Sequence, residues 1–172
     1  EPVFALDIKY TGETAASKIE RVRSEMKAAG ASSHVLTTLD DICWLLNIRG
    51  NDVAYSPLVL SYAVITENSV ELYMDETKLS SEIRSALEAD GVALHPYNEI
   101  YEDIKKAGDG EALLLDPDRL NYALYNNIPE HVKKIEARNP EILFKAVKNK
   151  TEIENIRKAE IKDSVAHVKF MK

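Results

Sequence analysis

The order of apolar segments constrains the fold of this chain more than any other feature of its sequence. Residues 61–66 and 70–75 are rich in β-branched and aromatic side chains and are separated only by Glu67, Asn68 and Ser69, which predicts an antiparallel hairpin. Beyond the hairpin, segments with helical periodicity alternate with short apolar segments. This alternation favours parallel strands with helices packed on the faces of the sheet. The chain is therefore predicted to be an α/β protein.

The alternating elements can be placed from their periodicity and their breakers. Helices are expected at residues 80–89, 99–106, 119–125 and around 140–144, and strands at residues 92–95, 112–115 and 132–135. The strand at 112–115 reads Ala-Leu-Leu-Leu, and a run without polar residues is typical of a strand buried on both faces. Pro96 and the Gly108-Asp109-Gly110 turn separate these elements.

The segment before the hairpin begins with a well-delimited helix. Thr14 is expected to be its N-cap and Gly30 its stop, with Ile19, Val22 and Met26 on one side. A short strand at 34–37 and a short helix at 39–46 should follow. Residues 47–57 are polar and contain Gly and Pro, so they are expected to form a loop.

The last segment predicts a long amphipathic helix. Residues 151–154, Thr-Glu-Ile-Glu, match a capping box with Thr151 as the N-cap. Apolar residues then follow at roughly helical spacing, namely Ile153, Ile156, Ile161, Val165 and Val168. No Gly or Pro stops this helix before Lys172, so we expect it to continue into, or pack against, a further domain.

Charge and cysteine content limit the partners and the compartment. The chain has 22 Lys and Arg against 29 Asp and Glu, a net charge of −7, and no basic cluster. We therefore expect no nucleic acid and no membrane as a partner. No apolar run approaches the roughly 18 residues of a membrane span. Cys43 is the only cysteine, which indicates a reducing, cytoplasmic setting.

Most residues of types used in catalysis have simpler explanations. The four histidines (His34, His95, His131 and His167) are far apart, without Cys or His at ligand spacing, so we expect surface or strand-end histidines and no metal site in this chain. Cys43 is expected to be a buried, unreactive thiol. The GxG turn joins a helix to a strand, the reverse of the order in phosphate-binding loops. The acid pairs Asp40/Asp41 and Asp116/Asp118 lie at predicted helix starts, where capping explains them.

One loop suggests a ligand-facing role. The only tryptophan, Trp44, precedes a polar segment that contains Asn47, Arg49, Gly50 and Asp52. Arg49 offers a planar set of donors suited to a carboxylate or a carbonyl, and Gly50 lets the backbone turn sharply. These five residues are the candidates for a substrate cleft, and no residue is predicted to be catalytic. On sequence alone, an Arg49–Asp52 ion pair that merely holds the loop is equally open.

The same loop resembles a known family. Residues 39–53, with Pro57 and residues 61–65, look like the middle domain of three-domain Xaa-Pro aminopeptidases, also called aminopeptidase P. The opening of that domain resembles residues 9–14 with Lys18 and residues 23–26, and its middle resembles His95-Pro96-Tyr97. Residues 148–159, with Asp163, Val165 and Ala166, resemble the linker and first helix of the family's catalytic domain. Cys43 departs from the small residue that the family more often has there.

The resemblance implies a fold and a division of the chain. The creatinase/prolidase N-terminal fold, with its ribonuclease H-like motif, has a mixed sheet of five or six strands with helices on both faces. Residues 1–10 would be a linker from a preceding domain, residues 11–148 the creatinase/prolidase-like domain, and residues 149–172 the start of the catalytic domain.

The resemblance also implies an activity for the parent protein. The parent would be a metallopeptidase with two Mn or Zn ions that releases the N-terminal residue before proline. Its ligands would lie beyond Lys172, and none can be assigned to this chain. The domain would wall the active-site cleft and support subunit association. Its partners would be its own catalytic domain, the preceding N-terminal domain, proline-containing peptides and a second copy in a homodimer.

Two other interpretations stay open. The chain could be a stand-alone small-molecule-binding α/β module, but this would require a glycine-rich or basic loop after a parallel strand, which the sequence lacks. It could also be the equivalent domain of a creatinase-like or inactive parent. Metal ligands downstream of Lys172 would distinguish an active parent from an inactive one.

Overall fold

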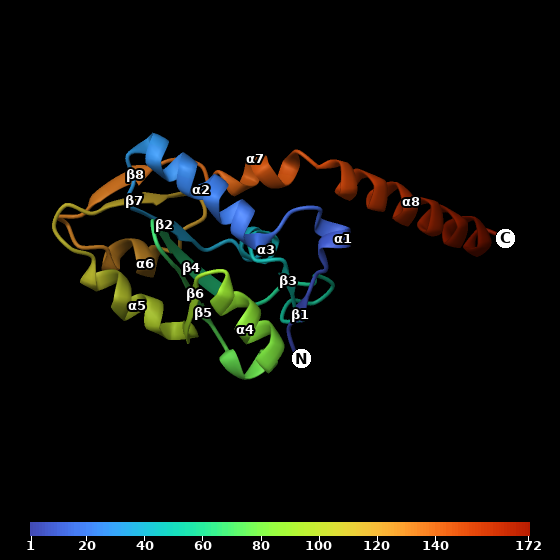
Figure 1. Ribbon diagram of the computed structural model, residues 1–172, viewed down its shortest axis with the longest axis horizontal. Coiled ribbons are helices and arrows are strands. Elements are labelled where there is room, and N and C mark those ends of the chain that lie inside the picture. The colour runs from blue at the N-terminus through green and yellow to red at the C-terminus, as the bar shows by residue number, and fades with distance from the viewer.

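A six-stranded mixed sheet forms the centre of the structure, a computed structural model that describes all residues from 1 to 172 (Figure 1). The strand order is β6-β5-β4-β2-β7-β8, and β1 and β3 form a separate two-stranded sheet. The strands are β1 (Phe4–Ala5), β2 (Ser33–Leu36), β3 (Ile48–Arg49), β4 (Ser61–Thr66), β5 (Val70–Met74), β6 (Val92–Pro96), β7 (Ala112–Leu115) and β8 (Lys133–Glu136). Only β4 runs antiparallel to its neighbours in the large sheet. The predicted β4–β5 hairpin and the parallel pairing after it are confirmed.

Helices cover both faces of this sheet. They are α1 (Ile8–Thr11), α2 (Ala15–Ala29), α3 (Leu39–Leu45), α4 (Ser81–Ala89), α5 (Ile100–Asp103), α6 (Tyr122–Asn127), α7 (Glu141–Ala146) and α8 (Lys150–Phe170), with three 3₁₀ turns, η1 (Glu76–Lys78), η2 (Tyr97–Glu99) and η3 (Ile104–Lys106). The predicted caps of α2 are confirmed, because the Thr14 hydroxyl accepts from the Ser17 amide at 3.2 Å and Gly30 adopts a left-handed φ of 72°.

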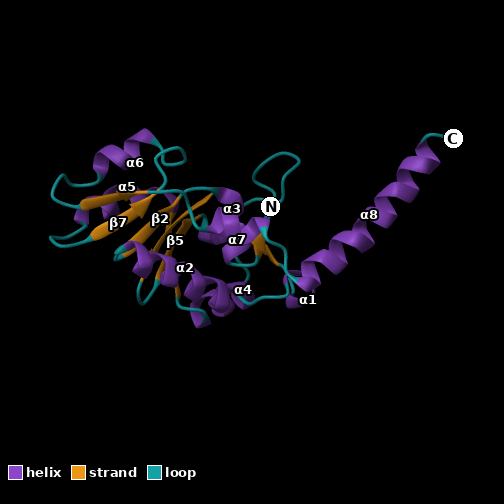
Figure 2. Cartoon of the chain, turned by 90° about the horizontal axis from the view of Figure 1, so that it is seen from above, coloured by secondary structure: helices purple, strands orange, loops and turns teal.

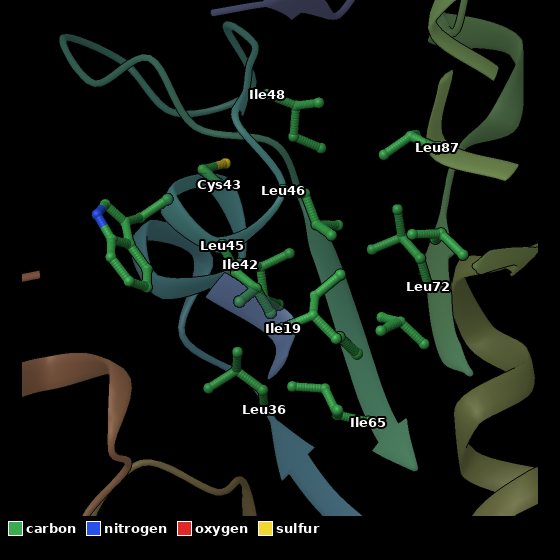
Figure 3. Packing of buried hydrophobic residues seen from close by; sticks show 14 of the residues in the cluster. Ile19, Leu36, Ile42, Cys43, Leu45, Leu46, Ile48, Ile65, Leu72 and Leu87 are labelled. Atoms are coloured by element: carbon green, nitrogen blue, oxygen red, sulfur yellow. The ribbon is translucent and has the colours of Figure 1, made fainter. Parts of the chain in front are cut away.

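Alternation along each strand divides the core into two layers. On β5, Leu72 packs with residues from α2, α3 and α4, whereas Tyr73 packs with residues from α5 and η3 on the other face. Figure 3 shows the first layer, in which Ile19 of α2 and Ile42 of α3 gather over the strands. All four residues of β7 are buried, as its unbroken apolar run predicts. The predicted α/β class, with helices on both sheet faces, is confirmed.

Three predicted segments differ from the structure by more than a shift of one or two residues. Helix α6 begins at Tyr122 rather than Arg119, because the Arg119 and Leu120 amides close a turn on the Asp116 carbonyl and Asn121 then caps the helix. The helix predicted at 99–106 is a succession of η2, α5 and η3. The loop at 47–57 contains β3, which pairs with β1.

Helix α8 projects from the body of the domain (Figures 1 and 2). Its N-cap is Asn149, whose side chain accepts from the Glu152 amide at 2.9 Å while the Glu152 carboxylate accepts from the Asn149 amide at 2.8 Å. The prediction of Thr151 as N-cap was therefore wrong, since Thr151 lies in the first turn. No residue of α8 is buried. None of the helices combines the length and the apolar character that crossing a bilayer requires.

Candidate functional site

Helix α3 positions the predicted ligand-facing loop. Its apolar side, with Ile42 and Leu45, is fully buried against the sheet (Figure 3). The chain leaves this helix through Asn47, which has a φ of 54°. It then enters β3, whose register places Arg49 opposite Phe4 of β1. The loop therefore starts from a rigid base rather than from a free segment.

The turn at Asn47 is held by a buried lysine. Lys18 of α2 donates to the Asn47 side-chain oxygen at 2.6 Å and to the Trp44 carbonyl at 2.7 Å. Its ammonium group also lies 4.4 Å from the centre of the Trp44 ring. Only 1% of Lys18 is exposed. Burial lowers the pKa of Lys18 to about 8.

The Arg49 guanidinium binds carbonyls and no carboxylate. Its Nη1 donates to the Cys43 carbonyl at 2.7 Å and to the Ile48 carbonyl at 2.8 Å, and the side chain is half-buried. The Arg49–Asp52 ion pair that the sequence left open is absent, so this interpretation was wrong. Arg49 keeps its charge uncompensated by any directly bound acid of this chain.

Asp52 instead joins the loop to η1. Its carboxylate accepts from Lys78 at 2.7 Å and from the Leu60 amide at 2.9 Å. Burial opposes the charge, but these two donors outweigh it, and the pKa of Asp52 lies below its usual value. Gly50 is required by close packing, because a Cβ there would lie 2.7 Å from Cγ2 of Val59.

All five candidates thus have defined structural contacts around the end of α3, and Arg49 is the one whose charge has no carboxylate partner. In the sequence, Lys18 was noted only as part of the family resemblance. Its contact with the loop was not predicted. A signal was present, since Ala15, Lys18, Ile19, Val22 and Met26 follow the spacing of the buried face of α2. Whether the five candidates face a substrate stays a prediction.

Cys43, Asp40 and Asp41 behave as predicted, but the prediction that Asp116 and Asp118 lie at a helix start was wrong, because Asn121 caps the helix that follows and α6 begins only at Tyr122. Cys43 is buried, its sulfur accepts from the Val59 amide at 3.4 Å, and burial raises the pKa of the thiol. Asp41, in the first turn of α3, binds Lys145 at 2.6 Å. Asp116 accepts from the Asp118 amide at 3.1 Å in the turn that follows β7.

The histidines required two corrections. His34 was expected at a surface or a strand end, but it is fully buried, with Nε2 3.2 Å from the Glu141 carboxylate. Ligand spacing was thought absent, yet ligand atoms of His95, Glu99 and Asp103 all lie within 4.8 Å of one another. Two of these three donors are already engaged, since Asp103 binds Lys106 at 2.6 Å and His95 Nε2 lies 2.6 Å from Glu71.

The fold and the loop at the end of α3 define a known class of domain. The family described as "Creatinase/Prolidase N-terminal domain" matches residues 1–152, and the chain belongs to this family. Its relatives make the assignment narrower. The chain is 39% identical, over 98% of its length, to Xaa-Pro aminopeptidase 1 of Dictyostelium discoideum and 35% identical, over 99%, to a probable Xaa-Pro aminopeptidase P of Neurospora crassa. It covers 27% and 26% of those proteins, so it spans about a quarter of the length of these curated relatives.

Solved structures agree with this assignment. A crystal structure of X-prolyl aminopeptidase from Caenorhabditis elegans, described as a cytosolic enzyme with a di-nuclear active site, has a TM-score of 0.94 at 33% identity over 99% of this chain and 29% of that chain. The prolidase of Pyrococcus horikoshii shares the fold, with a TM-score of 0.57 at 19% identity over 87% of this chain and 41% of that one. The resemblance and the fold predicted from the sequence are confirmed.

Proposed function

We propose that this chain is the non-catalytic domain of a metal-dependent Xaa-Pro aminopeptidase of the cytoplasm, which releases the N-terminal residue before proline. The names of its relatives support the activity, and the description of the C. elegans enzyme supports the compartment and a two-metal site. In this proposal residues 1–10 link to a preceding domain, residues 11–148 form the domain itself, and residues 149–172 begin the catalytic domain.

The metal ions belong to the part of the parent beyond Lys172 in this proposal. The donors of this chain do not fit a site for two ions, because the one group of three, His95, Glu99 and Asp103, is too small for two ions and is already hydrogen-bonded to Lys106 and Glu71. The two Mn or Zn ions of the proposed parent therefore have no ligands in this chain. No step of the reaction can be derived from its residues.

The contribution of this domain is to wall the active-site cleft. The single observation that carries this proposal is the Arg49 guanidinium, which is held on the loop by two carbonyls and has no carboxylate partner in the chain. A planar cation fixed in this way suits the carbonyl or carboxylate of a peptide at a domain boundary. The position of Arg49 is then supported by the other four candidates, Trp44, Asn47, Gly50 and Asp52.

Subunit association is the second role in this proposal. Helix α8 exposes Ile161, Val165 and Val168 on a helix that leaves the body of the domain. Apolar side chains in such a row favour burial against another folded surface. The proposed partners are the catalytic domain, the preceding domain and a second copy of the protein.

The test is Arg49→Ala in the full-length parent, with Arg84→Ala, which removes a surface ion pair to Glu76, as the matched control. Loss of one charge-assisted hydrogen bond of about 1.5–3 kcal/mol should lower kcat/KM about ten- to over a hundredfold toward Xaa-Pro peptides. Arg84→Ala should leave kcat/KM unchanged. Unchanged kinetics with a lowered Tm in Arg49→Ala would show that the loop is scaffolding only.

The alternatives are separated by other measurements. A small-molecule-binding module would use a pocket such as the one of about 670 Å³ between α2 and the β4–β5 turn, but charges of both signs line it, including Glu20, Arg23, Lys27 and Glu67. A creatinase-like or inactive parent is recognised by reading its sequence past Lys172 for metal ligands.

A further inference from the structure

We propose that Lys18 is a positioning residue for Arg49: its buried ammonium group fixes the end of α3 and the turn at Asn47, and so sets the direction in which Arg49 faces. This inference rests on the proposed role of Arg49 in the cleft and adds the residue that holds it there.

The first support is the set of contacts that Lys18 makes. Its ammonium group donates to the Trp44 carbonyl at 2.7 Å and to the Asn47 side-chain oxygen at 2.6 Å, and it lies over the Trp44 ring. Two oxygens and one aromatic face thus surround a group that has three N–H donors. One residue of α2 thereby binds both α3 and the loop that follows it.

The second support is the turn at Asn47 itself. Asn47 has a left-handed φ of 54°, a conformation that Asn adopts more readily than most residues, and its contacts fix it there. Besides Lys18, the Asn47 amide group donates to the Glu13 carbonyl at 2.9 Å, and the Leu6 amide donates to the Asn47 carbonyl at 2.7 Å. Of these contacts, the one to Lys18 is the only one made by a charged side chain.

The third support is that Lys18 and Arg49 bind neighbouring carbonyls at the same helix end. Arg49 donates to the Cys43 carbonyl and to no carboxylate, and Lys18 donates to the carbonyl of the next residue, Trp44. The last carbonyls of a helix lack intrahelical partners and carry partial negative charge. Lys18 and Arg49 therefore both bind carbonyl groups at the C-terminal end of α3. Because they bind adjacent residues, a shift of one side chain changes the position of the other.

The charges around Lys18 make this arrangement sensitive to pH. Burial lowers its pKa, Glu13 before α2 and Glu152 of α8 act in the opposite direction, and Arg49 of β3 and Arg21 of α2 lower it further. Glu13 is itself paired with Arg21 at 2.7 Å, and no carboxylate binds Lys18 directly. Loss of the Lys18 proton near pH 8 removes a donor and a charge, which should loosen the turn at Asn47.

Trp44 provides a direct probe, because it is the only tryptophan in the chain. We expect its fluorescence, excited where tyrosine does not absorb, to show a transition near pH 8 that is lost in Lys18→Met. The matched control is Lys27→Met, which removes an exposed lysine from the same helix and should keep the transition. A wild-type chain without the transition, or a Lys18→Met variant that keeps it, overturns the proposal.

A second variant keeps the proposal testable if Lys18→Met does not fold. Asn47→Gly keeps Lys18 and permits the positive φ, but it removes the side-chain oxygen that Lys18 binds. We expect amide exchange in residues 47–52 to become about tenfold faster in Asn47→Gly, with exchange in α2 unchanged. Unchanged exchange in the loop contradicts the proposal.

A double-mutant cycle in the full-length parent separates this proposal from the proposed function. If Lys18 acts through Arg49, Lys18→Met should lower kcat/KM about tenfold in the wild type and cause no further loss in Arg49→Ala. Additive losses leave the role of Arg49 intact and overturn the role of Lys18. If neither variant changes kcat/KM while Lys18→Met still abolishes the fluorescence transition, the proposed function fails and the positioning contact stands.

Discussion

The His34 imidazole and the Glu141 carboxylate lie 3.2 Å apart, and both side chains are fully buried. The other ring nitrogen of His34 lies 3.0 Å from the Leu114 carbonyl. The pair therefore joins β2 in the middle of the sheet to α7, the last helix before α8. The second carboxylate oxygen of Glu141 has no hydrogen-bond partner, so His34 is the one side chain that binds this buried carboxylate.

This pair should make the stability of the domain depend on pH. Burial opposes a charge on His34, but Glu141 and the Leu114 carbonyl outweigh it, and the pKa of His34 lies above its ordinary value of 6.5. The stabilisation is therefore fully present below pH 6.5 and is lost as pH rises through the higher folded-state pKa. Urea unfolding measured from pH 6 upward should show this decline, and Glu141→Gln should flatten it. An equal decline in both proteins contradicts the prediction.

Removal of the Glu141 carboxylate should be costly at neutral pH. Glu141→Ala leaves an unpaired group in the core and is expected to lower the free energy of unfolding by about 3–5 kcal/mol. The control Glu130→Ala removes an exposed carboxylate and should change it by less than about 0.5 kcal/mol. Chemical unfolding of the two variants gives the comparison, and similar values for both would refute it.

Local sequence patterns were sufficient for the hairpin and for the buried strand of the large sheet, but not for the strand order. The hairpin of β4 and β5 follows from two alternating runs with a short turn, and the burial of β7 follows from its apolar run. They were not sufficient for the start of α8, because Asn149 with Glu152 and Thr151 with Glu154 both match a capping box. Asn149 is selected by a contact 138 residues away in the chain, where its side chain donates to the Thr11 carbonyl at 2.7 Å.

In the candidate site, too, features set by neighbouring residues could be predicted, whereas contacts between residues far apart in the chain could not. The short helix and the polar loop after Trp44 were predicted from their own residues, as was the buried Cys43. The partners of the loop were not, because Lys18 and Lys78 reach it from α2 and η1. Only the packing of these elements decides that Asp52 binds Lys78 and that Arg49 keeps no acidic partner.

Gly12 should be essential where α1 meets α8. A Cβ at Gly12 would lie 2.6 Å from the Asn149 side-chain oxygen, and φ is 67°. Gly30 has a similar φ of 72°, but nothing lies within 4 Å of its Cβ position. Gly30→Ala should cost only the left-handed conformation, about 1–2 kcal/mol, and Gly12→Ala should cost more and speed amide exchange in the first turn of α8. Equal loss of Tm in the two variants would count against this.

The apolar row of α8 should behave as an unpartnered surface when the chain is isolated. Val165, Val168 and Met171 are each about half or more exposed, at 49%, 62% and 73%. In dilute solution we expect amide protection to decrease toward Lys172, and at high concentration we expect these residues to be buried against a second copy. The double variant Val165→Glu, Val168→Glu should abolish the concentration dependence in sedimentation. Uniformly slow exchange to the last turn of a dilute monomer contradicts this expectation.

The isolated chain should hold no tight Mn or Zn and should hydrolyse no Xaa-Pro peptide. The only group of three ligand-type side chains is His95, Glu99 and Asp103, and a metal would have to displace Lys106 from Asp103. Only Nδ1 of His95 is left for a metal, since Nε2 lies 2.6 Å from Glu71. We therefore expect calorimetry to detect at most weak binding, which His95→Ala should remove. A tight, saturable Mn or Zn site in the isolated chain would contradict this prediction, and its persistence in His95→Ala would place the ligands outside this group.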